Sequence, residues 1–253
     1  MNFNNLGGGR RRLMMAIGKK GPTVPNYFYV QDESGLGGEI WFPGRNTPAI
    51  NLIECSTDLE TWTPYSNIST TTRITLPAGG RVYMRGENSH MATSTGSWRW
   101  LQCDALHSVG GRLEYLLEKT GNPETIDNFT FVSFFGFYNA DNTTLIDASK
   151  LTLKILGTAT EFYRAMFRRC TALVKGPFVD MAYIPTRACQ EMFYNASSLQ
   201  ELKCSATNIS GSYTTTSWMQ GVSATGTFYK AASMTSWPRN ANGIPSGWTV
   251  MDL

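Results

Sequence analysis

Short runs of apolar and β-branched residues, separated by turn residues, fill the first half of the chain. Such runs are residues 27–30, 39–42, 50–56, 73–76 and 81–86, and residues 50–56 alternate between apolar and polar positions. Turn residues lie between them, for example Pro43-Gly44 and residues 77–80. Short strands at this spacing predict a small antiparallel β-sandwich over residues 26–101. Its expected core is Phe28, Ile40, Phe42, Leu52, Ile53, Trp62, Ile74, Val82 and Tyr83.

Residues 102–128 form a join between this region and the rest of the chain. Gly110-Gly111 and Gly121-Asn122-Pro123 bracket a short apolar segment, residues 112–117. The pattern of this segment is compatible with a short helix and with a strand, so both remain open.

An internal repeat marks the second half of the chain. The unit that starts Met166-Phe167 and ends at Leu173 recurs 26 residues later as the unit that starts Met192-Phe193 and ends at Leu199. A looser copy runs from Phe137 to Leu145. Because each unit is too short to bury its own apolar face, the units must stack. We therefore expect a short right-handed solenoid over residues 129–210, with one helical or turn segment and one short strand per unit. Together with the segment that follows, it would form a repeat domain over residues 129–253. Its expected repeat core is Phe137, Leu145, Met166, Phe167, Leu173, Met192, Phe193 and Leu199.

Residues 211–253 depart from the repeated pattern. Trp218, Trp237 and Trp248 occur there among several glycines. An open solenoid end would leave strand edges unpaired, so we expect this segment to be a C-terminal cap. The predicted fold is thus mainly β (α+β): an extended arm, a β-sandwich domain, a join and a capped repeat domain.

The charge of the chain is concentrated at its N-terminus. The net charge is +3, but residues 1–25 alone carry five basic residues and no acidic one, which leaves the remainder nearly neutral. Arg10, Arg11 and Arg12 precede a small apolar group, Leu13, Met14 and Met15. These six residues are candidates for docking on an acidic partner, and a plain disordered tail is the alternative. With no basic face elsewhere, they do not predict nucleic-acid binding.

Two further patterns bear on the cellular compartment in which the protein folds. The apolar run from Leu13 to Ile17 is too short for a secretory signal, and no run approaches the length of a membrane helix. The five cysteines are odd in number and lack zinc-ligand spacing, which favours free thiols in a reducing compartment. We expect no metal, no cofactor and no membrane insertion.

Candidate catalytic residues are few. Neither His90 nor His107 has a sequence context typical of a nucleophilic triad. Three acidic pairs lie beside turn residues, where aspartate normally serves the backbone: Asp32 with Glu33, Asp58 with Glu60, and Asp141 with Asp147. They keep glycoside hydrolysis open only as a minor alternative. We expect a protein that is not an enzyme.

Aromatic residues are the candidates for recognition. Tyr194, Tyr213 and Tyr229 are expected at an exposed ligand surface, because loops between repeats carry the binding residues of such scaffolds. Trp98 and Trp100 could stack on sugars, although neighbouring strand tryptophans more often pack in a core.

The repeat units resemble a known family. The patterns Met-Phe-x-x-Cys-Thr-x-Leu and Met-Phe-x-x-x-Ser-x-Leu are similar to the BspA-like leucine-rich repeats of bacterial surface proteins. Residues 145–151 resemble the first repeat of that family, and residues 206–210, 218–222, 226–230 and 243–250 resemble its closing unit. Residues 56–63 and 76–86 are similar to the β-domain often placed before such repeats. The resemblance covers residues 26–253.

Such repeats occur in secreted adhesins and in proteins of phages that infect gut Bacteroidetes. The arm over residues 6–15 resembles the N-terminal arms of virion proteins of those phages. The resemblance therefore implies a structural protein on the virion surface of a tailed phage, either a head fibre or decoration protein or a tail-fibre-like protein. Its partners would be capsid or tail proteins, further copies of itself, for example in a trimer, and a host-surface glycan or protein. A bacterial cell-surface or secreted adhesin is the alternative, and a carbohydrate-active enzyme is the third.

Overall fold

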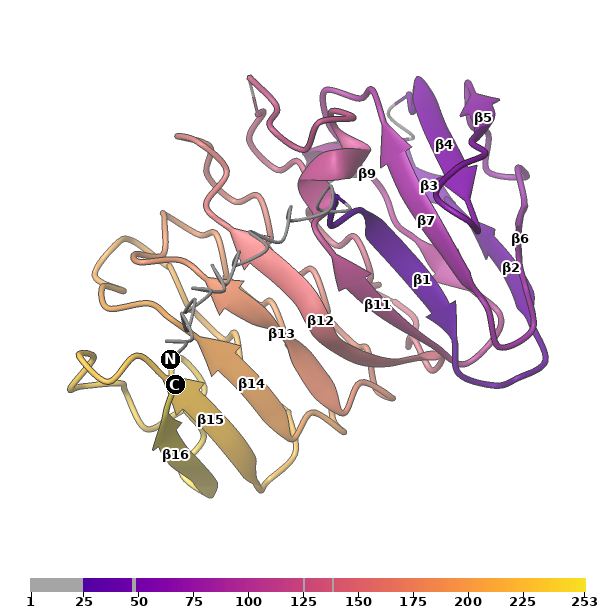
Figure 1. Ribbon diagram of the computed structural model, residues 1–253. Helices are drawn as coiled ribbons and strands as arrows, with labels where there is room; N and C mark the ends of the chain where they lie inside the picture. Colours follow the sequence, from indigo (N-terminus) through magenta and orange to yellow (C-terminus); the bar gives the residue numbers. More distant parts are fainter. Residues whose placement is uncertain (1–24, 47–48, 125, 138) are drawn as a thin grey trace, which may run out of the picture.

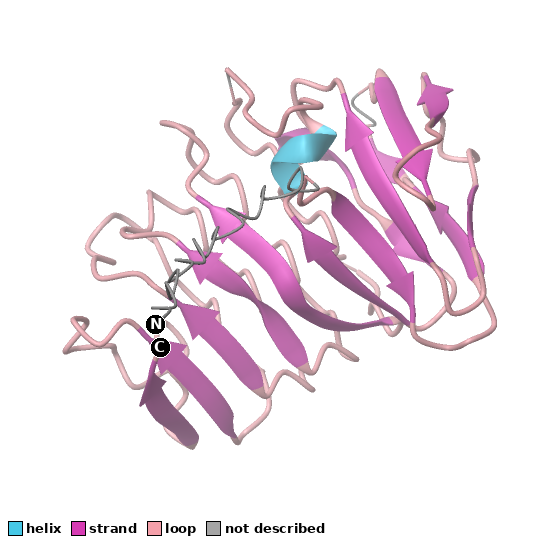
Figure 2. Cartoon of the chain, viewed as in Figure 1, coloured by secondary structure: helices cyan, strands magenta, loops and turns pink. Residues whose placement is uncertain are grey.

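The structure is a computed structural model that describes residues 25–46, 49–124, 126–137 and 139–253. The docking candidates Arg10, Arg11, Arg12, Leu13, Met14 and Met15 lie outside the described residues. Strands dominate the described part, as predicted, and they divide into one large and two small sheets (Figures 1 and 2).

One ten-stranded sheet runs through both halves of the chain. Its order is β16 (Trp248–Asp252), β15 (Gly226–Lys230), β14 (Glu201–Cys204), β13 (Lys175–Asp180), β12 (Leu145–Lys154), β11 (His107–Gly111), β1 (Phe28–Asp32), β7 (Arg81–Gly86), β4 (Leu52–Ser56) and β5 (Thr63–Ser66). Strands β11 to β16 are parallel, whereas β11, β1, β7, β4 and β5 pair antiparallel. Strand β11 is thus shared by the antiparallel and the parallel part, and no gap in the sheet separates them (Figure 1).

Two three-stranded antiparallel sheets complete the N-terminal half. One consists of β10 (Gln102–Cys103), β2 (Gly38–Trp41) and β6 (Ile74–Leu76), and the other of β3 (Gly44–Arg45), β9 (Ser97–Arg99) and β8 (Ala92–Ser94). Side chains from β2 and β6 pack in one apolar cluster with side chains from β1 and β7. The predicted antiparallel strands are therefore confirmed.

Six of the nine expected core residues of this half are buried, namely Phe28, Ile40, Phe42, Ile53, Ile74 and Val82. Leu52, Trp62 and Tyr83 are only half-buried. Successive residues of a strand point to opposite faces, so Leu52 cannot share the inner face with Ile53, nor Tyr83 with Val82.

The segment between the two halves adds two strands and one short helix. Strands β10 and β11 both lie in residues 102–128, and η1 (Leu113–Leu116) is a 3₁₀ helix. The open choice for residues 112–117 is therefore settled in favour of a helix. Its side chains are buried, which explains why the segment is apolar.

The second half is a β-solenoid of about 4 turns. Each coil contributes one strand to the large sheet and one turn segment on the opposite side (Figure 2). Every fourth residue of a turn segment has a positive φ: Glu161, Ala165 and Arg169 in one coil, Arg187, Glu191 and Asn195 in the next, and Tyr213, Ser217 and Gly221 in the third. Of the two expected options, helical or turn, the turn is correct.

Backbone hydrogen bonds explain this unusual conformation. The N–H groups alternate in direction: Met166 donates to Tyr163 within its own coil at 3.2 Å, and Phe167 donates to Met192 of the next coil at 2.8 Å. An α-helix would direct all its N–H groups within one segment. The alternation instead binds consecutive coils to each other on the side away from the sheet and satisfies buried donors there.

A row of stacked rings fills the solenoid interior. The rings of Phe135 and Phe167 lie 5.1 Å apart, and those of Phe167 and Phe193 lie 5.4 Å apart, both nearly parallel. Trp218 follows at 6.2 Å from Phe193, and Trp237 stacks on Trp218 at 5.4 Å. We call these five side chains the aromatic row.

The expected repeat core needs one correction. Leu145, Met166, Phe167, Leu173, Met192, Phe193 and Leu199 are completely buried, as predicted. Phe137 is also buried, but it packs edge-on against Trp100 and lies outside the aromatic row. Phe135 takes its place, because its N–H donates to Met166 just as that of Phe167 donates to Met192. The longer loop before Leu145 conceals this register in the sequence.

The expected cap is also corrected. Residues 211–253 continue the solenoid, because Trp218 extends the aromatic row and β15 and β16 extend the parallel sheet. The repeat is hidden since a tryptophan replaces the phenylalanine of the Met-Phe unit. Only the last coil is short, and there Met234, Trp237 and Ile244 cover the end of the core.

Candidate functional site

The two histidines of the chain lie in different surroundings, and neither is placed as a general base. His107 begins β11, is buried, and its Nδ1 lies 2.9 Å from the carbonyl oxygen of Ala105. Desolvation lowers the pKa of His107 to about 4. His107 is therefore a neutral core residue near pH 7, and its Nε2 has no hydrogen-bond partner among the described residues.

His90 has its sequence neighbour Ser89 and the distant Asp127 beside it, and only the structure reveals the aspartate. Its Nδ1 lies 2.9 Å from Ser89 Oγ and 3.1 Å from Asp127 Oδ2. A triad needs the serine at one ring nitrogen and the aspartate at the other, so that the ring takes a proton from the serine while the aspartate orients it. Here both partners share one nitrogen, and the arrangement is not a triad.

The acidic pairs expected from the sequence serve the backbone. Asp32 accepts hydrogen bonds from Ser34 Oγ, from the Gly79 N–H at 2.7 Å and from the Gly37 N–H at 2.9 Å. These bonds hold its pKa well below the usual range. Hydrogen bonds from the backbone of Thr61 and Glu60 and from Ser56 lower the pKa of Asp58 to about 2.

The two carboxylates of the third pair also have structural partners, and these partners differ. Asp141 forms an ion pair with Arg169 at 2.8 Å, and Asp147 accepts the N–H of Ser149 at 2.6 Å. The general acid of a glycosidase needs a raised pKa. Asp32 and Asp58 have lowered values and are turn-forming residues, so the geometry gives glycoside hydrolysis no support at these positions.

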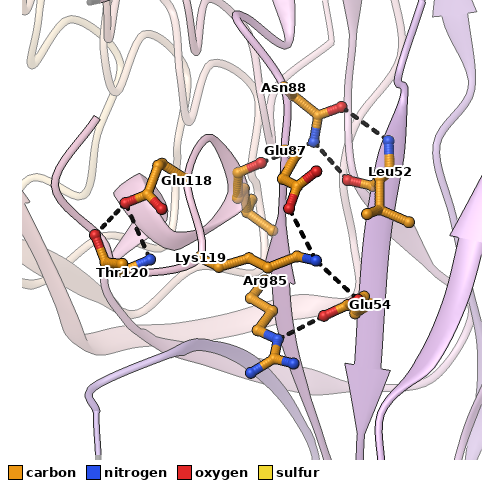
Figure 3. Close-up of polar contacts among 9 residues, drawn as sticks. Leu52, Glu54, Arg85, Glu87, Asn88, Glu118, Lys119 and Thr120 are labelled. Atoms are coloured by element: carbon orange, nitrogen blue, oxygen red, sulfur yellow. Dashed lines mark hydrogen bonds and ion pairs between the residues drawn. The ribbon is translucent and has the colours of Figure 1, made fainter. Parts of the chain in front are cut away.

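A charged cluster joins Glu54 of β4 and Arg85 of β7 with Glu87 and Lys119 (Figure 3). Glu54 receives Arg85 Nε at 2.6 Å on one oxygen and Lys119 Nζ at 3.0 Å on the other. Lys119 also contacts Glu87 at 2.9 Å. Partial burial opposes ionisation of Glu54, but the bonds from Lys119 and Arg85 outweigh it and lower the pKa of this carboxyl.

The buried side-chain amide of Asn88 forms hydrogen bonds next to this charged cluster. Asn88 accepts the N–H of Asn51 at 2.8 Å and donates to the carbonyl oxygens of Leu52 and Leu116, both at 2.8 Å. Figure 3 shows the contact with Leu52 beside Glu54 of β4 and Lys119 of the segment after η1, with Asn88 itself just after β7. Because the charges neutralise one another, we interpret this cluster as a clamp between three segments.

The three candidate tyrosines do not form one surface. Tyr194 and Tyr213 lie near opposite ends of the turn segments, and Tyr229 lies in β15 of the sheet. Each has a cation over its ring: Arg168 at 4.4 Å, Arg187 at 5.1 Å and Lys203 at 5.5 Å, respectively. Tyr213 is the most exposed, at 57%.

A hollow lined by aromatic rings lies where the small sheet of β3 and β9 meets the first coil of the solenoid. Its volume is about 210 Å³, and it is lined by Arg45, Trp98, Trp100, Phe137, Asn139 and Ala140. We call it the junction cavity. The Trp100 ring lies 6.4 Å from that of Trp98 and 5.4 Å from that of Phe137.

The sequence singled out only part of this cavity. Trp98 and Trp100 were candidates for sugar stacking or for core packing, and core packing is confirmed for Trp98. Trp98 is 4% exposed and packs against Ala92 and Val132, whereas Trp100 is half-buried beside them. Arg45, Phe137 and Asn139 come from distant segments, and no local pattern connects them with the tryptophans.

The described residues contain no group of three or more His, Cys, Asp or Glu side chains that could hold a metal ion. Within the same ranges, no helix has the length and apolar character needed to cross a bilayer.

No protein-family model, no curated protein and no solved structure matches this chain.

Proposed function

We propose that the protein is a structural component of a tailed-phage virion, a head fibre or decoration protein or a tail-fibre-like protein. Residues 10–15 attach it to a capsid or tail protein, and the body is displayed at the virion surface for contact with the host. The solenoid units belong, in this proposal, with the BspA-like leucine-rich repeats that their Met-Phe pattern resembles. Several copies side by side, as in a trimer, would multiply weak contacts.

One structural observation carries this proposal. The ten-stranded sheet passes from β5 to β16 without interruption, and the aromatic row stacks the coils behind it. Neighbouring parts of the body are therefore held by strand pairing and by core packing at once. A displayed protein needs such stiffness, because a surface held in a defined position loses less conformational entropy when it binds.

The charge distribution supports the attachment role of the arm. The basic residues in excess lie in residues 1–25, while body cations such as Arg85, Arg169 and Lys119 are paired with carboxylates. An arm with unbalanced charge is suited to an acidic surface, and nearby apolar side chains would add burial.

Immunogold electron microscopy tests the location. Antibodies against residues 129–253 are applied to phage lysates and to cells of the source. Labelled particles are the expected result, and the labelled position distinguishes head from tail. Label on cell envelopes with clean particles would overturn the virion proposal in favour of the adhesin.

A charge-reversal series tests the docking residues. The variant with Arg10→Glu, Arg11→Glu and Arg12→Glu is expected to be lost from purified particles. The control reverses three exposed lysines of the body, Lys150→Glu, Lys154→Glu and Lys175→Glu, with the same change in net charge. Normal incorporation of the arginine variant, or equal loss of both variants, would contradict docking by the arm.

A further inference from the structure

The junction cavity has the composition of a site for a flat, partly apolar ring that carries polar substituents. Trp98, Trp100 and Phe137 provide the apolar lining, and the guanidinium of Arg45 lies 5.6 Å from the centre of the Trp98 ring. Ligand sites in proteins combine aromatic walls with a few polar groups that fix orientation. We propose that this cavity binds a single sugar ring of a surface glycan, an inference that rests on the proposed display function.

The aromatic lining accounts for the apolar face of such a ring. A pyranose presents C–H groups on one face, and these pack favourably against the electron-rich face of an indole. Trp100 is half-buried, with its ring tilted by 43° from that of Trp98 and nearly perpendicular to that of Phe137. Its neighbours therefore fix the ring in place before any ligand arrives, which lowers the entropy lost on binding.

Polar side chains at the rim of the cavity would bind the hydroxyl groups of the sugar ring. Arg45 and Asn139 are both exposed at the rim and offer donors and an acceptor in planar arrays, which suit neighbouring hydroxyl groups.

Size limits the ligand to one ring. The cavity holds about 210 Å³, below the roughly 300–1,000 Å³ of sites for drug-sized molecules. A longer glycan would place one residue in the cavity and extend along the surface. A contact of this size is weak by itself, and several copies on one particle would strengthen it by avidity.

The indole N–H signals of the protein give a direct test. The uniformly ¹⁵N-labelled protein, which has seven tryptophans, is titrated with glucose, galactose, mannose, N-acetylglucosamine and glucuronic acid in turn. Trp100→Phe assigns the signal of Trp100. The expected result is a saturable shift of the Trp98 and Trp100 signals with at least one of these sugars.

Two rim variants locate the site. Arg45→Ala and Asn139→Ala change exposed side chains, and each is expected to weaken sugar binding about ten-fold, equivalent to about 1.4 kcal/mol. Arg73→Ala is the matched control, because Arg73 also lies over a tryptophan, 4.7 Å from the centre of the Trp41 ring, but away from the cavity. Its affinity is expected to be unchanged.

The possible failures are distinguishable. Absence of a saturable shift with all five sugars, or affinity unchanged in both rim variants, would overturn the sugar site. A protein that labels virions but binds none of the sugars would leave the virion proposal standing. A protein that binds sugar at the cavity but labels only cell envelopes would overturn the virion proposal alone.

Discussion

The ring of Phe193 lies 5.4 Å from that of Phe167, and the two planes differ by only 13°. The two residues are 26 positions apart, which is the spacing of the Met-Phe units in the sequence. One unit of sequence therefore equals one coil of the solenoid. Hydrogen bonds from Phe167 to Met192 and from Phe193 to Trp218, both 2.8 Å, keep consecutive rings in register.

Removal of a ring from the aromatic row should be strongly destabilising. Phe193→Ala leaves a cavity in a fully buried position, so we expect the free energy of unfolding to fall by about 3–5 kcal/mol. Urea denaturation measures the loss. Tyr213→Ala, at an exposed position of the turn segments, should lower the free energy of unfolding by no more than about 1 kcal/mol. Similar losses in the two variants would contradict the role of the row.

The cysteines should be unreactive while the protein is folded. All five are free and buried, and burial raises the pKa of the Cys55 thiol to about 12 and that of Cys103 to about 11. Only the thiolate reacts rapidly. A chromogenic thiol reagent should find no reactive thiol in native protein and five in denaturant. Fast reaction of one thiol without denaturant would show that part of the core is open.

His107 should make the fold sensitive to acid. Its pKa is about 4 in the folded protein against a normal value of 6.5, so the unfolded chain takes up a proton first as the pH falls. Above pH 6.5 the free energy of unfolding is unaffected by this histidine. It decreases by about 3 kcal/mol as the pH falls from 6.5 to about 4. His107→Gln should remove that part of the pH dependence in urea titrations, while His90→Gln should retain it. Identical profiles for wild type and His107→Gln would refute the assignment.

The clamp at Glu54 should contribute at neutral pH and lose its effect in acid. Glu54→Gln removes the charge that Arg85 and Lys119 share, with an expected loss of about 1–3 kcal/mol near pH 7. The folded pKa of Glu54 is lowered, so its contribution disappears as the pH falls through that value. The difference between wild type and variant should therefore shrink in acid. Glu60→Gln, at an exposed carboxyl of the same domain, is the control and should change little.

Gly111 closes the junction between the antiparallel and parallel parts of the sheet. It has a φ of +81°, and a Cβ there would lie 1.9 Å from the carbonyl oxygen of Tyr27. We expect Gly111→Ala to cost about 3 kcal/mol or more, from backbone strain and the clash together. Gly79 has a φ of +60° with open space around it, so Gly79→Ala should cost about 1 kcal/mol. Thermal unfolding of both variants would show a difference, and equal shifts would contradict the close approach.

Local patterns predicted the parts of the fold that depend on neighbouring residues. Alternation in residues 50–56 and the turn residues around it indicated antiparallel strands, and the recurrence of Met166-Phe167 at Met192-Phe193 indicated stacked coils. Where the spacing changed, the predicted register was wrong. Phe137 is buried, but Phe135, two residues earlier, occupies the position equivalent to Phe167. Trp218 was assigned to a cap because it stands where the other units have a phenylalanine.

Tertiary contacts decided the rest. The left-handed conformations at Glu161, Ala165 and Arg169 are unfavourable for isolated residues and persist only because adjacent coils accept their N–H groups. The junction cavity likewise exists only after β3, β9 and the first coil have met, so Arg45 and Asn139 carry no local sign of it. The sequence by itself determined which segments are strands and which residues repeat, because the spacing of apolar residues reflects which face of a strand or coil is buried. The structure alone decided the shared sheet and the cavity, because both depend on pairing between segments far apart in the chain.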